Sequence, residues 1–299
     1  MIYEYAVEPI LMTQKGTSSN IVNSFGPDKG RLISDFPEGW YEEVRKLIRK
    51  TKKPMANKAS INRLNRLAEQ RAFIKRVPQK PWAERSWLTN AEIENSFKPF
   101  QAILADVEEA DLNRNIVPGQ TADDSYDRWR IKRQVTVPRN AKNMGDAIKP
   151  LLELSREIVF VDRYFNPKTP SYLNVLEQFL EIVSNRQSGI SLLRIIYHFS
   201  FREKDFYDEE EFKKIATEKL EPIIPKHINL IFQESPDGSF HERYVLTDIG
   251  SVHMGIGLQE YVSGSNSTPE IEIANVGLAK DKFVKFTSEE IFHQVQGKK

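Results

Sequence analysis

The chain has 299 residues, and its 43 lysines and arginines against 42 aspartates and glutamates give a formal net charge of +1. This length is enough for two ordinary domains, and the 39% hydrophobic content is enough for a sizeable core. The chain contains no cysteine, which excludes disulfides, thiolate zinc sites and a cysteine nucleophile. It opens without the basic segment and apolar core of a signal peptide, and no run approaches the roughly 20 apolar residues of a membrane helix. We therefore expect a cytoplasmic protein without stable membrane insertion.

The first part of the chain is rich in tryptophan, proline, lysine and arginine, and its apolar residues recur mainly at helical spacing. This spacing predicts helices over residues 39–50, 60–74 and 89–110. The polar stretch near 112–127 contains proline, glycine and clustered aspartate, which predicts a linker or an exposed loop. The sequence thus predicts a mainly helical, basic N-terminal domain over residues 1–130.

Positive charge is concentrated between Arg45 and Lys80, a stretch in which Glu69 is the one acidic residue. Such an excess suits a nucleic-acid backbone, because each neutralised phosphate releases counterions. Trp82 and Trp87 follow directly, and they either stack on bases or anchor the domain core. An anionic membrane surface, or a solvated helical face balanced by acids elsewhere, are the alternatives. The cations expected to contact nucleic acid are Arg45, Lys46, Arg49, Lys50, Lys52, Lys53, Arg63 and Arg66.

In the second part of the chain, short apolar runs alternate with segments of helical period. The runs EIVFVDRYF, SLLRIIYHF and INLIFQES are typical of buried strands. FHERYVLTDIG and SVHMGIGL predict two further strands after an SPDG turn. Helices are expected over residues 142–156, 169–185 and 207–224. This order predicts an α/β domain over residues 131–299, with a mixed, mostly parallel sheet flanked by helices.

The run from His241 to Asp248 carries the residues best suited to phosphate chemistry. On an extended strand His241 and Arg243 point to the same side, whereas Asp248 approaches them only if the chain bends near Ile249-Gly250. A neutral imidazole can attack phosphorus while a guanidinium holds the non-bridging oxygens. A carboxylate that accepts the other ring N–H would fix the tautomer. These three residues are therefore the predicted catalytic set.

This pattern, HxRxxxxD, resembles the HxKxxxxD signature of the phospholipase D superfamily. The Gly255-Ile256-Gly257-Leu258 run and the Asp162-Arg163-Tyr164 element are similar to a single-motif subgroup. That subgroup includes the C-terminal domain of MIT-domain proteins and bacterial proteins met in antiphage defence loci. The resemblance spans roughly residues 135–297 and implies a phospholipase-D-like fold. It also implies substrate-binding roles for Asp162, Tyr164, Gly255 and Gly257. His253, expected near His241 across the hairpin, is a further candidate for contact with substrate.

The resemblance implies a metal-independent phosphodiesterase without cofactor, most simply a nuclease that forms a phosphohistidine on His241. Because the superfamily mechanism uses two histidines and the chain has one full motif, it implies a homodimer through this domain. Arg243 stands where the superfamily has lysine, and Ile256 and Leu258 stand where serine and asparagine are expected. A non-catalytic module that binds phosphate-bearing ligands, membrane lipid or a partner protein is the alternative. A third possibility is a subunit of a larger defence complex.

The other histidines give weaker patterns. His198, Ser200 and Asp205 repeat part of the motif spacing, which predicts either a second half-site or a histidine at a strand edge. His227 and His293 are expected at the surface. No pair of histidines has the close, regular spacing of a zinc site, so we expect no metal.

Overall fold

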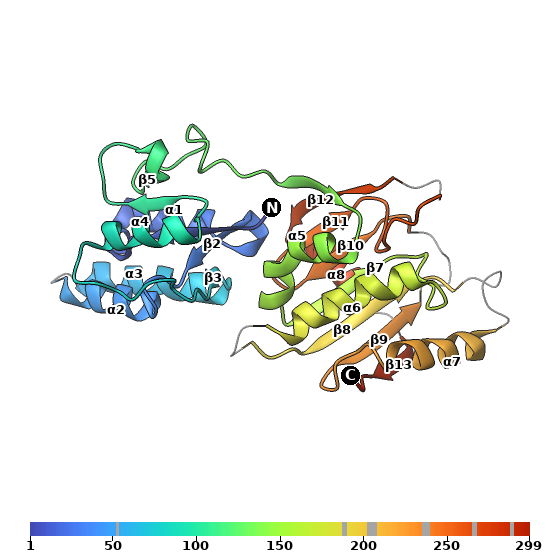
Figure 1. The fold of residues 1–299 in the computed structure, drawn as a ribbon. Helices are drawn as coiled ribbons and strands as arrows, with labels where there is room; N and C mark the ends of the chain where they lie inside the picture. The colour runs from blue at the N-terminus through green and yellow to red at the C-terminus, as the bar shows by residue number, and fades with distance from the viewer. Residues whose placement is uncertain (52–53, 187–189, 202–207, 235–239, 265–267, 288–289) are drawn as a thin grey trace. The chain divides into compact units, whose positions relative to one another are not determined.

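The computed structural model describes the chain apart from residues 52–53, 187–189, 202–207, 235–239, 265–267 and 288–289. The chain divides into two compact units, Ile2–Lys132 and Arg133–Lys299, close to the expected boundary (Figure 1). Each unit is built on its own β-sheet. Within the described residues, no helix combines the length and apolar composition that crossing a membrane requires.

The N-terminal unit contains a five-stranded parallel sheet, so the expectation of a mainly helical domain is corrected to an α/β unit. The strands have the order β3-β2-β1-β4-β5 and are short, which hides them from periodicity analysis. Their bounds are β1 (Tyr3–Val7), β2 (Arg31–Ser34), β3 (Phe73–Ile74), β4 (Ile103–Ala105) and β5 (Ile116–Pro118).

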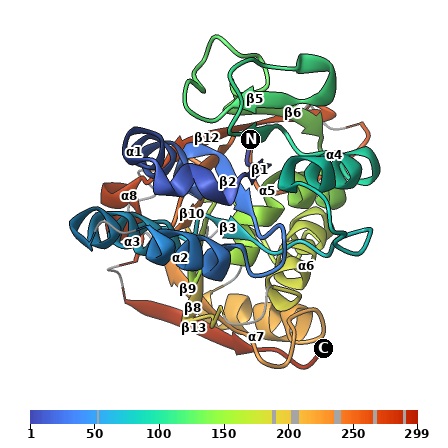
Figure 2. The ribbon, with the colours of Figure 1, turned by 90° about the vertical axis from the view of Figure 1, so that its left-hand side faces the viewer.

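Helices cover both faces of this sheet. α1 (Lys15–Ser24), α2 (Trp40–Lys50) and α3 (Pro54–Glu69) pack on one face, with α2 and α3 side by side (Figure 2). α4 (Trp87–Phe97) packs on the other face. Because strand side chains alternate between faces, Tyr5 of β1 joins the first apolar cluster and Ala6 joins the second.

Three predicted elements of this unit are corrected. The helix expected over residues 60–74 is α3, which begins and ends earlier, and residues 73–74 form β3 instead. The helix expected over residues 89–110 begins earlier, after Ser86, whose Oγ accepts the N–H of Thr89 at 3.1 Å. It ends at Phe97, because the proline that follows Lys98 disfavours helical backbone. The expected linker near 112–127 instead contributes the 3-10 turn η3 (Leu112–Arg114) and strand β5.

The C-terminal unit contains an eight-stranded mixed sheet of order β13-β9-β8-β7-β10-β11-β12-β6. Only the β7–β8 and β8–β9 neighbours are parallel, so the expectation of a mostly parallel sheet is wrong. β10 enters antiparallel beside β7, and the chain then continues through antiparallel neighbours. The bounds are β6 (Gln134–Pro138), β7 (Glu157–Val161), β8 (Arg194–Phe199), β9 (Asn229–Glu234), β10 (Tyr244–Thr247), β11 (Ser251–Met254), β12 (Glu270–Gly277) and β13 (Ile291–Gln296).

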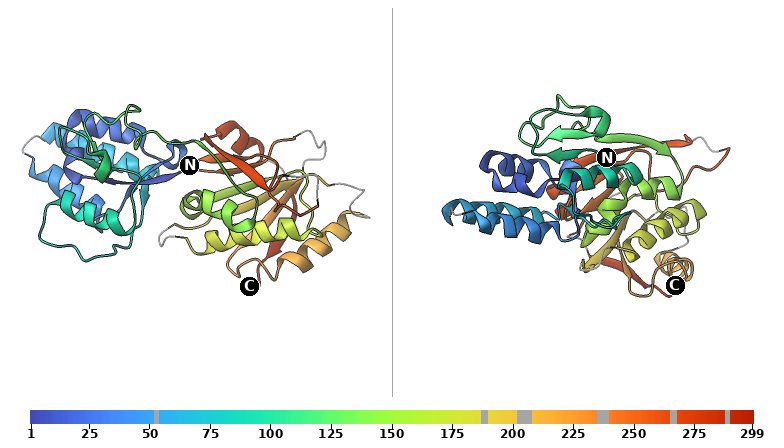
Figure 3. Two further views of the ribbon diagram at one scale, coloured as in Figure 1. Left: turned by 45° about the horizontal axis from the view of Figure 1, so that its top comes forward. Right: turned by 60° about the vertical axis from the view of Figure 1, so that its left-hand side comes forward.

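Helices of this unit lie near the positions that the sequence predicts. α5 (Ala141–Leu154) and α6 (Pro170–Ser184) lie side by side (Figure 3), and Phe179 of α6 packs on Phe160 of β7. α7 (Glu209–Leu220) begins where Asp208 accepts the N–H of Glu211 at 2.8 Å, as its capping pattern predicts. The opposite face, which carries Val159 and Tyr244, packs against the short helix α8 (Lys280–Lys285).

Candidate functional site

The candidate site forms where β7 ends and β10 begins. These strands are antiparallel, and Val161 pairs with Tyr244. The register therefore brings the residues after β7, Asp162 to Tyr164, beside the residues before β10, His241 to Arg243. Two segments that are about eighty positions apart in the sequence, as in the 78-residue separation of Arg163 from His241, meet at this edge.

His241 is exposed, and its ring contacts Arg163. The Nη1 atom of Arg163 lies 3.2 Å from Nδ1 and 3.3 Å from Nε2 of His241. A guanidinium can only donate, so it donates to whichever ring nitrogen carries the lone pair. The imidazole is thus accessible and stands beside a permanent cation.

Arg243 lies on the same side as His241, as strand alternation predicts. Its Nη1 donates to the backbone oxygen of His241 at 3.1 Å. The guanidinium carbons of Arg243 and Arg163 each lie 5.1 Å from the centre of the Tyr164 ring. The ring therefore attracts both cations and holds them close together.

Asp162 is fully buried and does not face a ligand, which corrects its expected substrate-binding role. Its two carboxylate oxygens accept the N–H groups of Tyr164 at 3.0 Å and Leu258 at 2.8 Å. Burial raises the pKa of Asp162, while the two backbone hydrogen bonds and the charges of Arg243 and Arg139 act in the opposite direction. Asp162 therefore ties the segment that carries Arg163 to the GIGL run.

The two glycines of the GIGL run are needed for backbone fit. Gly257 has a φ of +127°, and a Cβ there would lie 2.9 Å from Oδ2 of Asp162. Gly255 has a φ of +26°, and a Cβ would lie 2.8 Å from the backbone oxygen of Glu272. Glycine is the residue that adopts these conformations without strain. The substrate-binding roles expected for both glycines stay predictions.

Arg139, which follows β6, is a charged residue of the site that sequence reasoning missed. It is buried, and its Nε donates to the backbone oxygen of Gln259 at 2.9 Å. Burial lowers the pKa of Arg139, while the charges of Tyr172 and Asp162 oppose that shift. No motif surrounds this residue in the sequence, and only tertiary packing brings it to the site.

A hollow of about 380 Å³ opens beside these arginines. Its lining combines the guanidinium of Arg243 with the first turn of α6, where helix N–H groups leave a partial positive charge. Among the described residues, His241 is outside this lining and is linked to it through Arg243 and Arg163. The lining residues are Tyr164, Asn166, Thr169, Tyr172, Arg243, Ile256 and Gln259. The hollow therefore has a cation in its wall and more than enough room for a phosphate group.

Asp248 does not approach His241, so its predicted catalytic role is wrong. Its Oδ1 accepts the N–H of Arg156 at 3.0 Å and of Glu157 at 3.3 Å, at the opposite end of β7 from Arg163. The separation corresponds to about six residues of strand, or roughly 20 Å. The bend that the motif reading required does not bring the carboxylate back, because β10 continues straight along β7.

His253 lies on the other side of the sheet from Arg243. It pairs directly with Tyr244, and the two rings stand edge to face with centres 5.3 Å apart. Directly paired residues share one face, and Arg243 alternates away from it. The structure therefore does not bring His253 to the candidate site.

His198 is a core residue and not part of a second half-site. It is fully buried between the rings of Phe240 at 5.2 Å and Phe286 at 4.7 Å. Burial lowers its pKa to about 4. Asp205, the last residue of the partial motif that begins at His198, lies outside the described residues. His227 is exposed, and His293 is half-buried with its Nε2 2.9 Å from Oγ1 of Thr217.

Most of the predicted nucleic-acid-binding cations lie on α2 and α3. Lys46, Arg49, Lys50 and Arg66 are exposed, and Arg63 is half-buried. Arg45 is paired within α2 with Glu42 at 2.9 Å. Lys52 and Lys53 lie outside the described residues. The exposed cations of these helices thus remain available to an anionic partner.

The two tryptophans near this segment differ in environment. Trp87 packs against the apolar cluster under α4, whereas Trp82 is 47% exposed. The sequence left open whether these tryptophans stack on bases or anchor the domain core, and the position of Trp87 matches the anchoring role.

In the described part of the chain, no group of three or more histidine, aspartate or glutamate side chains is arranged to hold a metal ion.

Comparisons with known proteins give little. No protein-family model matches the chain, and no curated protein matches it. A solved structure of TrmBL2, described as an archaeal chromatin protein with a novel mode of DNA binding, aligns at a TM-score of 0.29 and 16% identity. The alignment covers 53% of this chain and 51% of that one, so the chain spans about half the length of the structure it matches. A likeness this small carries no argument about fold or function.

Proposed function

We propose that the C-terminal unit is a phospholipase-D-like, metal-independent phosphodiesterase that cleaves nucleic acid through His241. One observation carries the proposal: the exposed imidazole of His241 stands beside the Arg163 guanidinium, and Arg243, which donates to the backbone oxygen of His241, lines an adjacent hollow. The HxRxxxxD pattern adds the resemblance to a family with this chemistry. The same resemblance suggests antiphage defence as the setting.

The reaction begins when a phosphate enters between Arg163 and Arg243. A phosphate oxygen is a stronger acceptor for a guanidinium than a neutral imidazole nitrogen is. Arg163 therefore turns its N–H groups to the phosphate and leaves the ring nitrogen of His241 free to attack. The two arginines then neutralise the charge that builds on the non-bridging oxygens.

Two displacements complete the turnover. In the first, a ring nitrogen of His241 bonds to phosphorus, the phosphorus–oxygen bond to the leaving group breaks, and the leaving oxygen takes a proton. In the second, water attacks phosphorus, the phosphorus–nitrogen bond breaks, and the water gives up a proton. The proton donor and acceptor is a second imidazole, which a homodimer would supply as the partner's own His241.

The test is cleavage by the full chain in EDTA. End-labelled single- and double-stranded DNA and RNA are incubated with the wild type and with His241→Ala, Arg163→Ala and Arg243→Ala. We expect His241→Ala to abolish cleavage and each arginine variant to lower kcat/KM by roughly 100-fold or more. His227→Ala, which removes an exposed histidine elsewhere, is the matched control. Cleavage that persists in His241→Ala, or a wild type that cleaves none of the four polymers, contradicts the proposal.

The exposed cations of α2 and α3 support nucleic acid as the substrate. Log affinity falls as log salt rises, and a Lys46→Glu/Arg49→Glu variant should make this slope shallower by about 2, one for each lost phosphate contact. An unchanged slope would mean that these helices do not touch the polymer.

A non-catalytic phosphate-binding module is the second candidate, and the position of Asp248 favours it. Among the described residues, the ring of His241 bonds to Arg163 and no carboxylate orients it. Under this reading Arg163→Ala and Arg243→Ala weaken binding, His241→Ala leaves binding unchanged, and no polymer is cut. The cleavage assay and a parallel binding assay therefore separate the two candidates.

A further inference from the structure

A second hollow, of about 960 Å³, lies in the N-terminal unit beyond the ends of β2 and β3. Its lining comes from the segments that follow these two strands and from one side of α4. The carboxyl ends of parallel strands are where α/β sheets bind ligands, and the volume is that of a small-molecule site.

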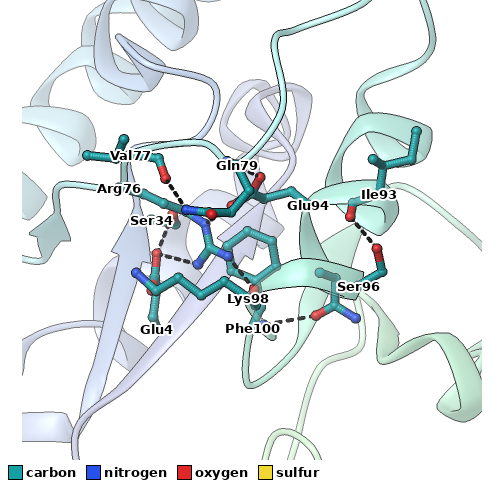
Figure 4. A network of polar contacts seen from close by, with 11 residues as sticks. Glu4, Ser34, Arg76, Val77, Gln79, Ile93, Glu94, Ser96, Lys98 and Phe100 are labelled. Atoms are coloured by element: carbon teal, nitrogen blue, oxygen red, sulfur yellow. Dashed lines mark hydrogen bonds and ion pairs between the residues drawn. The ribbon is translucent and has the colours of Figure 1, made fainter.

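The wall of this hollow is held in place by a buried charge network (Figure 4). The guanidinium of Arg76 is fully buried, with Nη1 3.0 Å from Glu4 and Nε 2.8 Å from Glu94. The other oxygen of Glu94 accepts the N–H of Gln79 at 2.8 Å. Further along, Asn90 exchanges hydrogen bonds with the backbone of Ala83, at 3.1 and 3.2 Å. The segment that lines the hollow is therefore fixed at two points, so the site is preformed.

Two aromatic rings remain exposed at the hollow. Trp82 is 47% exposed and leans on Phe36, with ring centres 5.6 Å apart. Phe97 is 55% exposed, and Nζ of Lys80 lies 5.1 Å from its ring centre. A large aromatic face exposed on a rigid segment is a stacking surface for a planar ring.

The charges at the hollow are of both signs and are separated along the chain. Lys80 and Arg85 lie in the segment that carries Trp82, whereas Glu38 and Glu43 come from the stretch between β2 and the first turns of α2. Within the described part of the chain, none of these four side chains forms an ion pair or a side-chain hydrogen bond. A ligand that carries both an anion and hydrogen-bond donors on a ring matches this arrangement.

We propose that this hollow binds a nucleotide. The base stacks on Trp82, and the carboxylates of Glu38 and Glu43 accept its amino or imino N–H groups. Lys80 and Arg85 take the phosphate. A free mononucleotide and the end of a single strand present the same chemistry. The proposal is independent of phosphodiesterase activity in the C-terminal unit.

The experiment measures binding in a His241→Ala background, so that cleavage of the probe cannot affect the result. Calorimetry and tryptophan fluorescence measure the binding of each probe. The probes are AMP, GMP, CMP and UMP, the four nucleosides, ribose 5-phosphate and a 5′-phosphorylated single-stranded oligonucleotide. We expect nucleotides to bind more tightly than nucleosides or ribose 5-phosphate. Trp82→Ala should weaken nucleotide binding by roughly 10-fold or more, and Trp82→Phe should retain most of it.

Charge variants test the two ends of the ligand separately. Lys80→Ala/Arg85→Ala should weaken the binding of nucleotides but leave the binding of nucleosides unchanged. Glu38→Gln/Glu43→Gln should reduce the differences in affinity among the four bases. Lys15→Ala/Arg128→Ala, which removes two exposed cations of the same unit that do not line the hollow, is the matched control.

Two results would overturn the inference: equal nucleotide affinity for Trp82→Ala and wild type, or no binding of any probe at about 1 mM. Either leaves the cleavage assay of the C-terminal unit untouched. If the oligonucleotide binds at least roughly 10-fold more tightly than the mononucleotides, the ligand is a strand end. Comparable affinities indicate a free nucleotide.

Discussion

Each unit buries a charge cluster, but the two clusters differ in charge balance. In the N-terminal unit the buried Arg76 is paired with two carboxylates, Glu4 and Glu94. In the C-terminal unit the buried carboxylate of Asp162 stands among arginines, whose charges act on it from Arg139 and Arg243. A cluster whose cation is fully paired serves the fold, whereas a surplus of cations leaves charge for a ligand. The comparison therefore separates a structural network from the proposed phosphate site.

The largest expected effect is on the paired cluster. Arg76→Met leaves Glu94 buried and uncompensated, which should lower the free energy of unfolding by about 3–5 kcal/mol. Urea unfolding followed by tryptophan fluorescence reports this unit alone, because all four tryptophans of the chain lie in it. Lys98→Met, which removes an exposed cation 3.8 Å from Glu4, is the control and should cost under about 1 kcal/mol. Equal losses in the two variants would show that the network is not structural.

The second prediction concerns pH and the C-terminal core. The pKa of His198 falls from 6.5 to about 4 on folding, so the unfolded chain binds the proton first. Stability is therefore complete above pH 6.5 and is lost as the pH falls toward 4, by about 2–3 kcal/mol. Hydrogen exchange of peptides from β7 and β8 at pH 7 and pH 4.5 measures the loss.

His198→Phe should flatten this pH dependence, whereas His227→Gln, at an exposed position, should retain it. A steep loss that persists in His198→Phe would assign the titration to another group.

The third prediction concerns the close contact between Gly257 and Asp162 beside the proposed phosphate site. Gly257→Ala places a Cβ 2.9 Å from Oδ2 of Asp162 at a φ of +127°, which should cost about 1–3 kcal/mol. Phosphate affinity should fall along with stability, because Asp162 fixes the segment that carries Arg163. Thermal unfolding with and without inorganic phosphate measures both. Gly264→Ala also replaces a glycine of positive φ, at +83°, but its Cβ meets no atom within 4 Å. This control therefore measures the cost of the backbone conformation alone.

The smallest effect is expected at Asp248. Asp248→Ala removes two backbone hydrogen bonds at the start of β7, which should cost about 1 kcal/mol or slightly more. Because the residue is remote from Arg163, phosphate affinity should stay at the wild-type value. A loss of phosphate affinity larger than the loss of stability would restore Asp248 to the site.

The features that depend only on residues near one another in the sequence were predicted. Strand alternation predicted that His241 and Arg243 share a side, and capping chemistry predicted the start of α7. Asp248 was misplaced because spacing along a motif says nothing about whether a strand bends. Arg163, to which the sequence assigned no role, is the residue that contacts His241.

The parts that escaped prediction depend on long-range packing. β3, with two residues, is too short to show a period, so the N-terminal sheet stayed hidden. The antiparallel entry of β10 beside β7 is set by register between distant segments, and the same register brings Arg163 to His241. Arg139 reaches the cluster only because β6 pairs with β12 on the far side of the sheet.

The hydrogen bond from Leu258 to Asp162 joins residues 96 positions apart. A growing chain on the ribosome therefore cannot complete the cationic site until Leu258 has been synthesised and has left the exit tunnel. Until then Asp162 lacks one of its two backbone donors. We therefore expect phosphate binding by this unit to appear only after Leu258 has been added to the chain.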